Sequence, residues 1–217
     1  IQMPTAKLLD MEYARSRYAD YDPAQASTST AVGPGLGPWR ESYETTHFSV
    51  VDEHGNAVAV TYTLNGLFGS GVTIAGTGIV MNNEMDDFTA KVGEPNMYGV
   101  LQSPANGVEP GKRPLSAMTP TIVVRDGKPF LVTGAPGGPT IISTVLQNII
   151  NVIDFGMDAQ AAADAPRFHH QWMPDELRME SEGFSPDTVR ILEAMGHRVR
   201  LGSLMSKAMN ILATEDG

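Results

Sequence analysis

Two threonines and a histidine stand directly in front of a β-strand pattern in the stretch ETTHFSVV, residues 44–51. A threonine at the start of a strand is ordinary, because β-branched residues favour extended backbone. If the bond between Glu44 and Thr45 were broken, however, the Thr45 hydroxyl would lie beside a free α-amine, whose usual pKa is about 7.7. Such an amine can act as the general base for its own side chain. The stretch therefore fits either a plain strand entry or an N-terminal nucleophile.

Two acidic side chains, Glu84 and Asp87, share the short segment NNEMDDF. A solvated acidic loop would explain them, and a calcium loop is conceivable, but the spacing fits no EF-hand. Paired carboxylates also select a cation through charge-assisted hydrogen bonds. The segment is therefore either a solvated acidic loop or a place that favours a cation.

Two glycines, Gly137 and Gly138 in GAPGGP, stand just before a long apolar helix pattern. They could be a simple strand-to-helix turn, in which glycine is common. Backbone N–H groups at such a position are unpaired, and the helix dipole favours negative charge there. The pair is therefore also a candidate site for negative charge.

Histidines and cysteines give no metal site. His169 and His170 are adjacent, so on a strand they point to opposite sides, and no third ligand is spaced to join them. Packing, or a hydrogen bond to a carboxylate, is the better interpretation. His47 and His54 are assigned no role. The chain has no cysteine, which excludes disulfides, thiolate catalysis and zinc–thiolate sites.

Composition is that of a globular protein: 217 residues, 41% hydrophobic and 18% charged. The net charge of −10 and the lack of a basic stripe argue against nucleic acid as a partner. No apolar run reaches the length of a membrane-spanning helix, and the first residues contain no signal-peptide core.

The first 44 residues differ from the rest. Residues 4–18 have the pattern of one helix, with Pro4 in its first turn, and residues 21–39 are rich in Pro, Gly, Ser and Thr, which predicts an extended, mobile linker. From Thr46 onwards β and helical patterns dominate. We expect residues 1–44 to be a tail separate from a domain at 45–217.

The second region predicts two hairpins and three helices. The expected hairpins are HFSVV with AVAVTYTL, in which Thr63 and Asn65 face the same side of the second strand, and residues 120–133, turning at 125–128. Helices are expected at 141–153, at 158–165 and after the Ser185 cap. The glycine-rich residues 66–78 are expected to be a loop, and MNILATEDG a strand entering an unfinished Asp-Gly turn. These elements indicate an α+β fold with antiparallel sheet layers and outer helices.

The motifs ETTHFSVV, TYTLN, NNEMDDF, KRPLSAM, GAPGG and DAPRFHHQW, in this order, resemble the γ-glutamyltranspeptidase family, specifically its small subunit with the tail of the large subunit attached. The resemblance implies an N-terminal nucleophile hydrolase fold, an αββα four-layer sandwich, here without most of the large subunit and truncated at the end. It implies autocatalytic cleavage between Glu44 and Thr45, with no cofactor and no metal.

The resemblance also assigns roles. Thr45 would be the nucleophile, Thr63 its hydrogen-bond partner, and the Gly137 and Gly138 amides the oxyanion hole. Asn65, Glu84, Asp87 and Ser116 would bind the amino-acid end of the substrate, with Tyr98 on a lid at residues 92–100 that could equally be an ordinary surface loop. Many members have a second serine after the equivalent of Ser116, whereas this chain has Ala117.

By resemblance, the substrate would be glutathione or another γ-glutamyl compound, and the acceptor an amino acid, a peptide or water. The missing large subunit would be the partner and would supply an arginine to the substrate carboxylate. A periplasmic or secreted location is implied. Two alternatives stay open: a β-lactam side-chain acylase of the same superfamily, and an unprocessed, non-catalytic chain.

Overall fold

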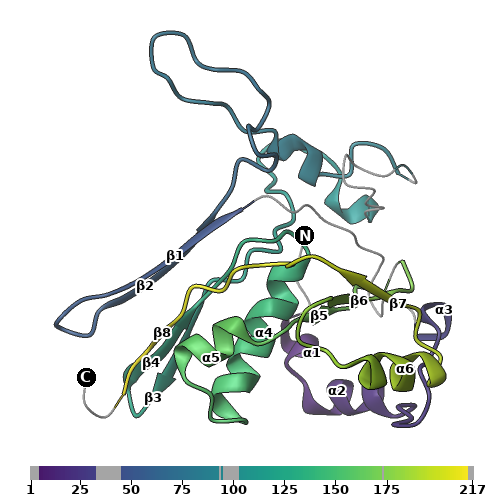
Figure 1. The fold of residues 1–217 in the computed structure, drawn as a ribbon. Coiled ribbons are helices and arrows are strands. Elements are labelled where there is room, and N and C mark those ends of the chain that lie inside the picture. The colour runs from purple at the N-terminus through teal and green to yellow at the C-terminus, as the bar shows by residue number, and fades with distance from the viewer. Residues whose placement is uncertain (1–4, 33–44, 93, 95–102, 173, 215–217) are drawn as a thin grey trace.

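The computed structural model describes residues 5–32, 45–92, 94, 103–172 and 174–214 (Figure 1). Its helices are α1 (Thr5–Leu8), α2 (Met11–Tyr18), α3 (Ser29–Val32), α4 (Thr140–Ile153), α5 (Ala159–Asp164) and α6 (Pro186–Ala194), with 3-10 turns η1 (Glu84–Asp87) and η2 (Pro104–Asn106). Its strands are β1 (Thr46–Val51), β2 (Ala57–Tyr62), β3 (Thr121–Arg125), β4 (Lys128–Thr133), β5 (Phe168–His169), β6 (Leu177–Glu180), β7 (Val199–Gly202) and β8 (Ile211–Leu212).

Both predicted hairpins are confirmed. Strands β1 and β2 pair antiparallel, from Thr46 opposite Tyr62 to Val51 opposite Ala57. Strands β3 and β4 pair through a turn in which Asp126 and Gly127 both have positive φ, as a two-residue hairpin loop requires. The predicted strand near the end of the chain is β8, which adds to the free edge of β4. The Asp-Gly turn expected after it lies outside the described residues.

The main body is layered. The β1–β2 hairpin lies against the β3–β4–β8 sheet, and α4 and α5 cover the other face of that sheet (Figure 1). The core between sheet and helices contains Leu131, Val152 and Ala162, with Ile141 and Val145 of α4 in a second cluster. The apolar period of α4 therefore predicted its buried side only in part, since Ile141 and Val145 are buried but Ile142, Leu146 and Ile153 are 53%, 54% and 46% exposed. An α+β architecture is confirmed, with two β layers and one helical layer in this part.

The β1–β2 hairpin has one apolar face that the described residues leave exposed. The register places Phe48, Val50, Val58 and Tyr62 on the same face, and their exposed fractions are 44%, 50%, 49% and 55%. The opposite face carries His47 and meets the β3–β4–β8 sheet. A hairpin with apolar residues on both faces is typical of an inner layer of a sandwich.

A third sheet departs from the prediction of purely antiparallel layers. Strand β5 pairs antiparallel with β6, but β6 and β7 are parallel and are joined by α6. A parallel neighbour requires a crossover connection, and α6 supplies it after the predicted Ser185 cap, whose hydroxyl accepts from Thr188 N. The strands are only two to four residues long, too short to show a β period.

The single helix expected at residues 4–18 is wrong. The segment forms two helices, α1 and α2, because the Asp10 carboxylate accepts from Glu12 N and starts a new helix. The apolar residues that suggested one amphipathic helix are not buried: Leu9 is 78% exposed and Met11 65% exposed. The cap at Asp10 therefore separates α1 from α2.

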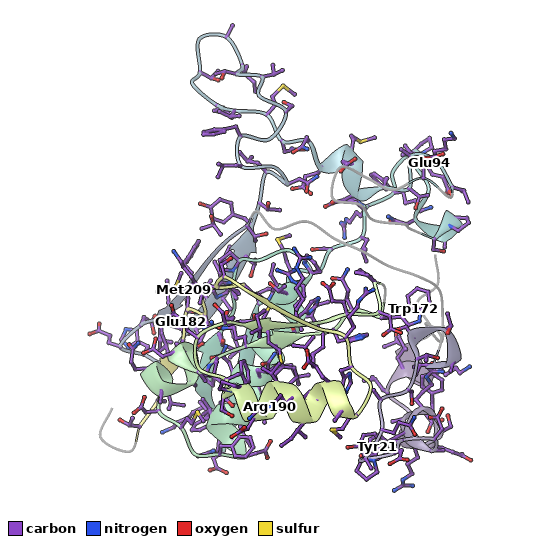
Figure 2. All side chains as sticks on the ribbon, turned by 45° about the vertical axis from the view of Figure 1, so that its right-hand side comes forward. Tyr21, Glu94, Trp172, Glu182, Arg190 and Met209 are labelled. Carbon is purple, nitrogen blue, oxygen red and sulfur yellow. The ribbon has the colours of Figure 1, made fainter. Side chains whose placement is uncertain are left out.

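The linker expected at residues 21–39 is ordered where the structure describes it, and residues 33–39 lie outside the described part. Ser29 in α3 is buried, its N–H bonds to Asp175 Oδ2 at 3.0 Å, and its carbonyl accepts from Trp172 Nε1. Figure 2 shows Trp172 beside these N-terminal helices. The expectation of a mobile segment is therefore wrong for α3, since contacts 146 residues apart hold it.

Residues 63–83 form a long loop that extends away from the layered body (Figure 1). It contains no helix and no regular strand, as expected of its glycines. Within the part of the chain described, no helix has the length and apolar character to cross a membrane.

Candidate active site

A cavity of about 100 Å³ opens where the β1–β2 hairpin, the η1 turn, the loop before β3 and the start of α4 converge. Seven of the side chains and backbone groups predicted from sequence line it: Thr45, Thr63, Asn65, Glu84, Asp87, Ser116 and Gly138. These positions span more than ninety residues of sequence, so the fold has gathered them. Glu44 and Tyr98 lie outside the described residues.

Thr45 is placed by hairpin pairing. Thr46 lies opposite Tyr62, so the residue before β1 lies next to the residue after β2, which is Thr63. Thr45 also lines a second, open cavity of about 260 Å³, which it shares with Gly137. Thr45 therefore lines both cavities.

His47, to which the sequence assigned no role, anchors the strand behind Thr45. It is buried, and its ring nitrogens bond to Thr61 Oγ1 at 2.7 Å and Ser49 Oγ at 3.1 Å. Burial lowers the pKa of His47, which favours the neutral ring. A Cβ added at Gly134 would lie 2.1 Å from His47 Cε1, so glycine is needed there for the ring to fit.

Thr63 and Asn65 do not lie on a strand, which corrects the prediction. Strand β2 ends at Tyr62, and Asn65 has φ 69°, a left-handed conformation that asparagine tolerates better than most residues. The Thr63 hydroxyl accepts from Asn65 N at 2.9 Å, and Asn65 Nδ2 donates to Asn83 O at 3.2 Å. The turn nevertheless leaves both residues at the cavity.

Glu84 and Asp87 face each other across the η1 turn and share a side-chain hydrogen bond. Burial, together with the bond and the repulsion from Asp87, raises the pKa of Glu84 to about 8. Burial also raises the pKa of Asp87, against the lowering effect of the bond to Glu84. Glu84 Oε1 is buried and has no hydrogen-bond partner among the described residues. A bound cation would lower both pKa values, because it favours the ionised form of each carboxyl group.

Asn106, which joins the acidic turn to the serine loop, was not predicted from the sequence. Its Nδ2 donates to Asp87 O at 2.6 Å, and its Oδ1 accepts from Leu115 N at 3.1 Å. Asn106 is buried. Asparagine is common in loops for local reasons, so nothing in the sequence distinguishes this one.

Ser116 and Ala117 both line the cavity. The Ser116 hydroxyl accepts from Met118 N at 3.2 Å, in a loop without regular structure. Ala117 is buried and brings no hydrogen-bonding group to the cavity wall.

Gly137 and Gly138 precede α4 with φ values of 135° and 57°. A Cβ at Gly137 would lie 2.5 Å from Thr140 Oγ1 and 2.9 Å from Met205 O, so only glycine fits. Glycine amides just before a 14-residue helix are groups that can bind an anion, and Gly138 lines the small cavity while Gly137 lines the open one.

The two adjacent histidines are outside this cavity. His169 Nδ1 bonds to Ser143 Oγ at 2.8 Å and His169 Nε2 to Gln171 Oε1 at 2.9 Å, while His170 lies 3.3 Å from Asp175. The predicted packing and carboxylate contacts are therefore present. Among the described residues, no three His, Cys, Asp or Glu side chains gather as a metal site would require.

Comparison with known proteins identifies the family of the chain. The profile of the family described as gamma-glutamyltranspeptidase matches residues 1–217. The glutathione hydrolase proenzyme of Escherichia coli is 53% identical over 218 aligned residues, which cover all of this chain and 37% of that protein. This chain therefore spans little more than a third of the length of that relative.

Two solved structures agree on the fold. A mutant of the gamma-glutamyltranspeptidase of Helicobacter pylori has a TM-score of 0.74 and 51% identity, over 77% of this chain and 90% of that one. A cephalosporin acylase from Bacillus halodurans has a TM-score of 0.80 and 25% identity, over all of this chain and 37% of that one. The fold is that of the N-terminal nucleophile hydrolases, and the chain belongs to the γ-glutamyltranspeptidase family.

Proposed function

We propose that this chain carries the catalytic site of an enzyme that transfers or hydrolyses the γ-glutamyl group of glutathione and related compounds. One observation supports this most: Thr45, the paired acids Glu84 and Asp87, and Ser116 line one cavity of about 100 Å³, a volume suited to an amino-acid-sized group. The paired acids could bind a cation, and the serine hydroxyl could donate a hydrogen bond to an anion. Together they fit the α-ammonium and α-carboxylate of a γ-glutamyl group.

The buried Glu84 Oε1 supports an ammonium ligand in particular. A buried acceptor without a partner costs about 1–3 kcal/mol, more when it is charged, and a bound cation would remove that cost. Asn65 lies close enough to contact the same end of the substrate. Ser116 would bind the carboxylate, with an arginine from the remainder of the protein. Tyr98 is proposed to cover the substrate.

In the reaction, the Thr45 hydroxyl attacks the γ-carbonyl carbon while the Thr45 α-amine accepts the hydroxyl proton. Thr63 orients the hydroxyl, and the amides of Gly137 and Gly138 bind the oxyanion, each donor contributing about 3 kcal/mol to the barrier reduction. The amine returns the proton to the leaving nitrogen, which leaves a γ-glutamyl ester on Thr45. Water or an acceptor amine then cleaves the ester. This chemistry requires neither a metal nor an organic cofactor.

The amine becomes available only when the bond between Glu44 and Thr45 is cut. We propose that Thr45 cuts it itself, so that residues 1–44 end the large subunit and residues 45–217 belong to the small subunit. Intact mass of the full-length protein tests this. Thr45→Ala should stay single-chain, whereas the neighbouring Thr46→Ala should still be cut. A wild-type protein that stays single-chain and yet turns over substrate would refute the N-terminal nucleophile.

Recognition of the ammonium has its own test. Asp87→Asn should reduce turnover of γ-glutamyl-p-nitroanilide about 30-fold or more, since truncating one partner of a buried charge pair costs about 2–5 kcal/mol. It should affect glutaryl-p-nitroanilide, which lacks the α-amine, far less. Equal losses on the two compounds would favour an acylase.

The acylase alternative is supported by the likeness to the cephalosporin acylase, which extends over the whole chain. The acid pair argues against it, because an acyl group without an α-ammonium gives Glu84 and Asp87 nothing to bind. A non-catalytic chain remains a second alternative, and the intact-mass experiment decides it.

We propose the large subunit as the partner. The exposed apolar face of the β1–β2 hairpin, formed by Phe48, Val50, Val58 and Tyr62, supports this, since the predicted αββα sandwich needs a further helical layer on that side. A periplasmic or secreted location is proposed from the family resemblance alone.

A further inference from the structure

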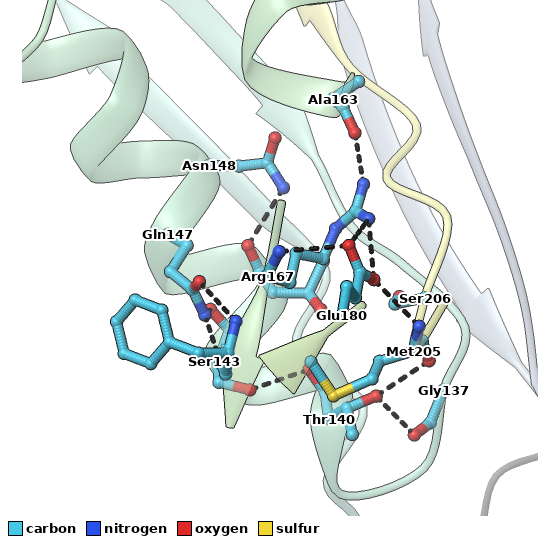
Figure 3. A network of polar contacts seen from close by, with 12 residues as sticks. Gly137, Thr140, Ser143, Gln147, Asn148, Ala163, Arg167, Glu180, Met205 and Ser206 are labelled. Atoms are coloured by element: carbon cyan, nitrogen blue, oxygen red, sulfur yellow. Dashed lines mark hydrogen bonds and ion pairs between the residues drawn. The ribbon is translucent and has the colours of Figure 1, made fainter. Parts of the chain in front are cut away.

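A buried ion pair lies behind the glycine loop, outside the cavity. Arg167 and Glu180 each have a relative exposure of 5%, and Arg167 Nη1 lies 3.1 Å from Glu180 Oε1 and 3.2 Å from Oε2. Arg167 N also donates to Glu180 Oε2, and Arg167 Nη2 donates to Ala163 O (Figure 3). The pair therefore fixes the end of β6 to the residues that precede β5. Nothing in this arrangement requires a further contact to another segment.

Glu180 nevertheless makes one. Its Oε1 accepts from Met205 N at 2.8 Å. Met205 belongs to residues 203–210, which connect β7 to β8 without helix or strand; one end of them is held by a backbone bond from Met209 N to Gly134 O at 2.9 Å, and Met205 lies away from that bond. Met205 and Ser206 are buried all the same. The Glu180 carboxylate is thus an anchor for a segment that has no regular structure.

The anchored segment packs directly on the glycine loop. Thr140 Oγ1, at the start of α4, shares its proton between Met205 O at 3.1 Å and Gly137 O at 2.8 Å. Ser206 Oγ donates to Pro136 O. Met205 O is also the atom that a Cβ at Gly137 would approach to 2.9 Å. Figure 3 shows these contacts running from Glu180 through Met205 and Thr140 to Gly137.

We propose that Glu180 is a positioning residue for the oxyanion hole: through Met205 and Thr140 it holds Gly137, and with it the amides of Gly137 and Gly138, in the orientation that binds the oxyanion. The proposal rests on the proposed function, in which those amides act on the transition state. Glu180 does not line the substrate cavity, so it touches neither substrate nor reacting atoms.

The consequence is kinetic. Groups that stabilise only the transition state change kcat and leave KM unaltered, whereas groups that bind the ground state change KM. A misplacement of about 1 Å in catalytic geometry can cost about 100-fold in rate. Loosening the Glu180 contact should therefore reduce kcat and spare KM, which a purely structural ion pair would not do selectively.

Two double variants of the full-length protein isolate the contact. Arg167→Met with Glu180→Gln removes both charges and keeps an oxygen that can accept from Met205 N. Arg167→Met with Glu180→Leu removes both charges and the acceptor. On γ-glutamyl-p-nitroanilide, per mole of cleaved protein by intact mass, the leucine variant should have a kcat at least tenfold below that of the glutamine variant, with the same KM. Equal kcat values would overturn the proposal.

Thr140→Val provides a second test that leaves the ion pair intact. It removes the hydroxyl that joins Met205 to Gly137, and Thr144→Val, one turn further along α4 and equally buried, is the matched control. Thr140→Val should lower kcat about tenfold at unchanged KM, while Thr144→Val should retain the wild-type kcat. Equal kcat in these two variants would overturn the proposal even if the double variants fail to fold.

Failure of the two proposals can be told apart. If the wild-type protein releases no p-nitroaniline, the proposed function fails. If the wild type is active and the paired variants do not differ in kcat, only the positioning role of Glu180 fails.

Discussion

Glu180 is buried and Glu84 is partly buried, with one buried carboxylate oxygen, and their surroundings are opposite. Glu180 meets the Arg167 guanidinium and two backbone N–H groups, those of Arg167 and Met205. Glu84 meets another acid, Asp87, and its Oε1 has no partner in the described part of the chain. The first carboxylate is neutralised by Arg167, whereas one oxygen of the second has no hydrogen-bond partner among the described residues.

Under the proposed function, this difference separates a carboxylate that organises the protein from one that binds the substrate. A buried carboxyl oxygen without a partner is costly, so a fold retains one only where another constraint outweighs stability. Glu84 and Asp87 lie at the candidate active site, and Arg167 and Glu180 lie behind it. Under the two proposals, one glutamate therefore binds the substrate and the other positions the glycine loop.

The largest expected effect comes from making the same exchange at both glutamates. Glu180→Gln should destabilise the protein by about 3–5 kcal/mol, because it leaves the buried Arg167 charge without its counter-ion. Glu84→Gln should cost little, since a neutral amide resembles the protonated acid that burial favours there. Urea unfolding of both variants at pH 7 measures this. Similar losses would mean that the two sites do not differ in the way described.

A smaller loss of stability is expected from Asn106, which holds the acidic turn in place. Asn106→Ala removes two buried hydrogen bonds, to Asp87 O and from Leu115 N, at a cost of about 1–3 kcal/mol. Because these bonds join the acidic turn to the serine loop, KM for γ-glutamyl-p-nitroanilide should rise more than kcat falls. A loss of kcat alone would place Asn106 with the oxyanion loop instead.

The pH dependence of stability should be smaller again, because Glu84 is only partly buried. Its pKa is raised from 4.5 to about 8, so folding favours the protonated form. That contribution to stability is complete below pH 4.5 and is lost as the pH rises through about 8. The Tm of the substrate-free wild type should therefore fall between pH 5 and pH 9 more steeply than that of Glu84→Gln. Parallel curves would contradict the raised pKa.

Much of this fold is predictable from local signals. The Asp126–Gly127 turn, the helix α4 and the Ser185 cap each depend on residues close in sequence, and each was predicted correctly. The site could be predicted because the family motifs mark Thr45 and the other lining residues. Their joint placement in one cavity agrees with those expectations.

The remaining features depend on contacts between distant residues. Asn65 has positive φ, and its side chain bonds to Asn83 O. The alternating strand pattern that predicted Thr63 and Asn65 on a strand depends only on neighbouring residues, so it could not show this contact. The Ser29–Asp175 contact orders a segment whose composition suggests mobility. The Arg167–Glu180 pair looks in sequence like two ordinary charges, and only burial distinguishes it from a solvated pair.

The smallest expected effect is a gain, at the position where the chain departs from its family. Ala117 lines the cavity beside Ser116, whose hydroxyl accepts from Met118 N and still has a proton to donate. Ala117→Ser would add a second donor to the same end of the cavity. A hydrogen bond to a charged group contributes about 1.5 kcal/mol or more, and water that already binds the carboxylate would reduce the net gain.

KM for γ-glutamyl-p-nitroanilide should therefore fall by up to about tenfold in Ala117→Ser, with little change in kcat, because the new bond would be equally strong in ground state and transition state. Ser116→Ala is the matched control and should raise KM. If Ala117→Ser leaves KM unchanged while Ser116→Ala raises it, the carboxylate lies nearer Ser116 than this geometry implies. If neither variant changes KM, the carboxylate does not bind at this loop, and only the acid pair would then define the substrate end of the cavity.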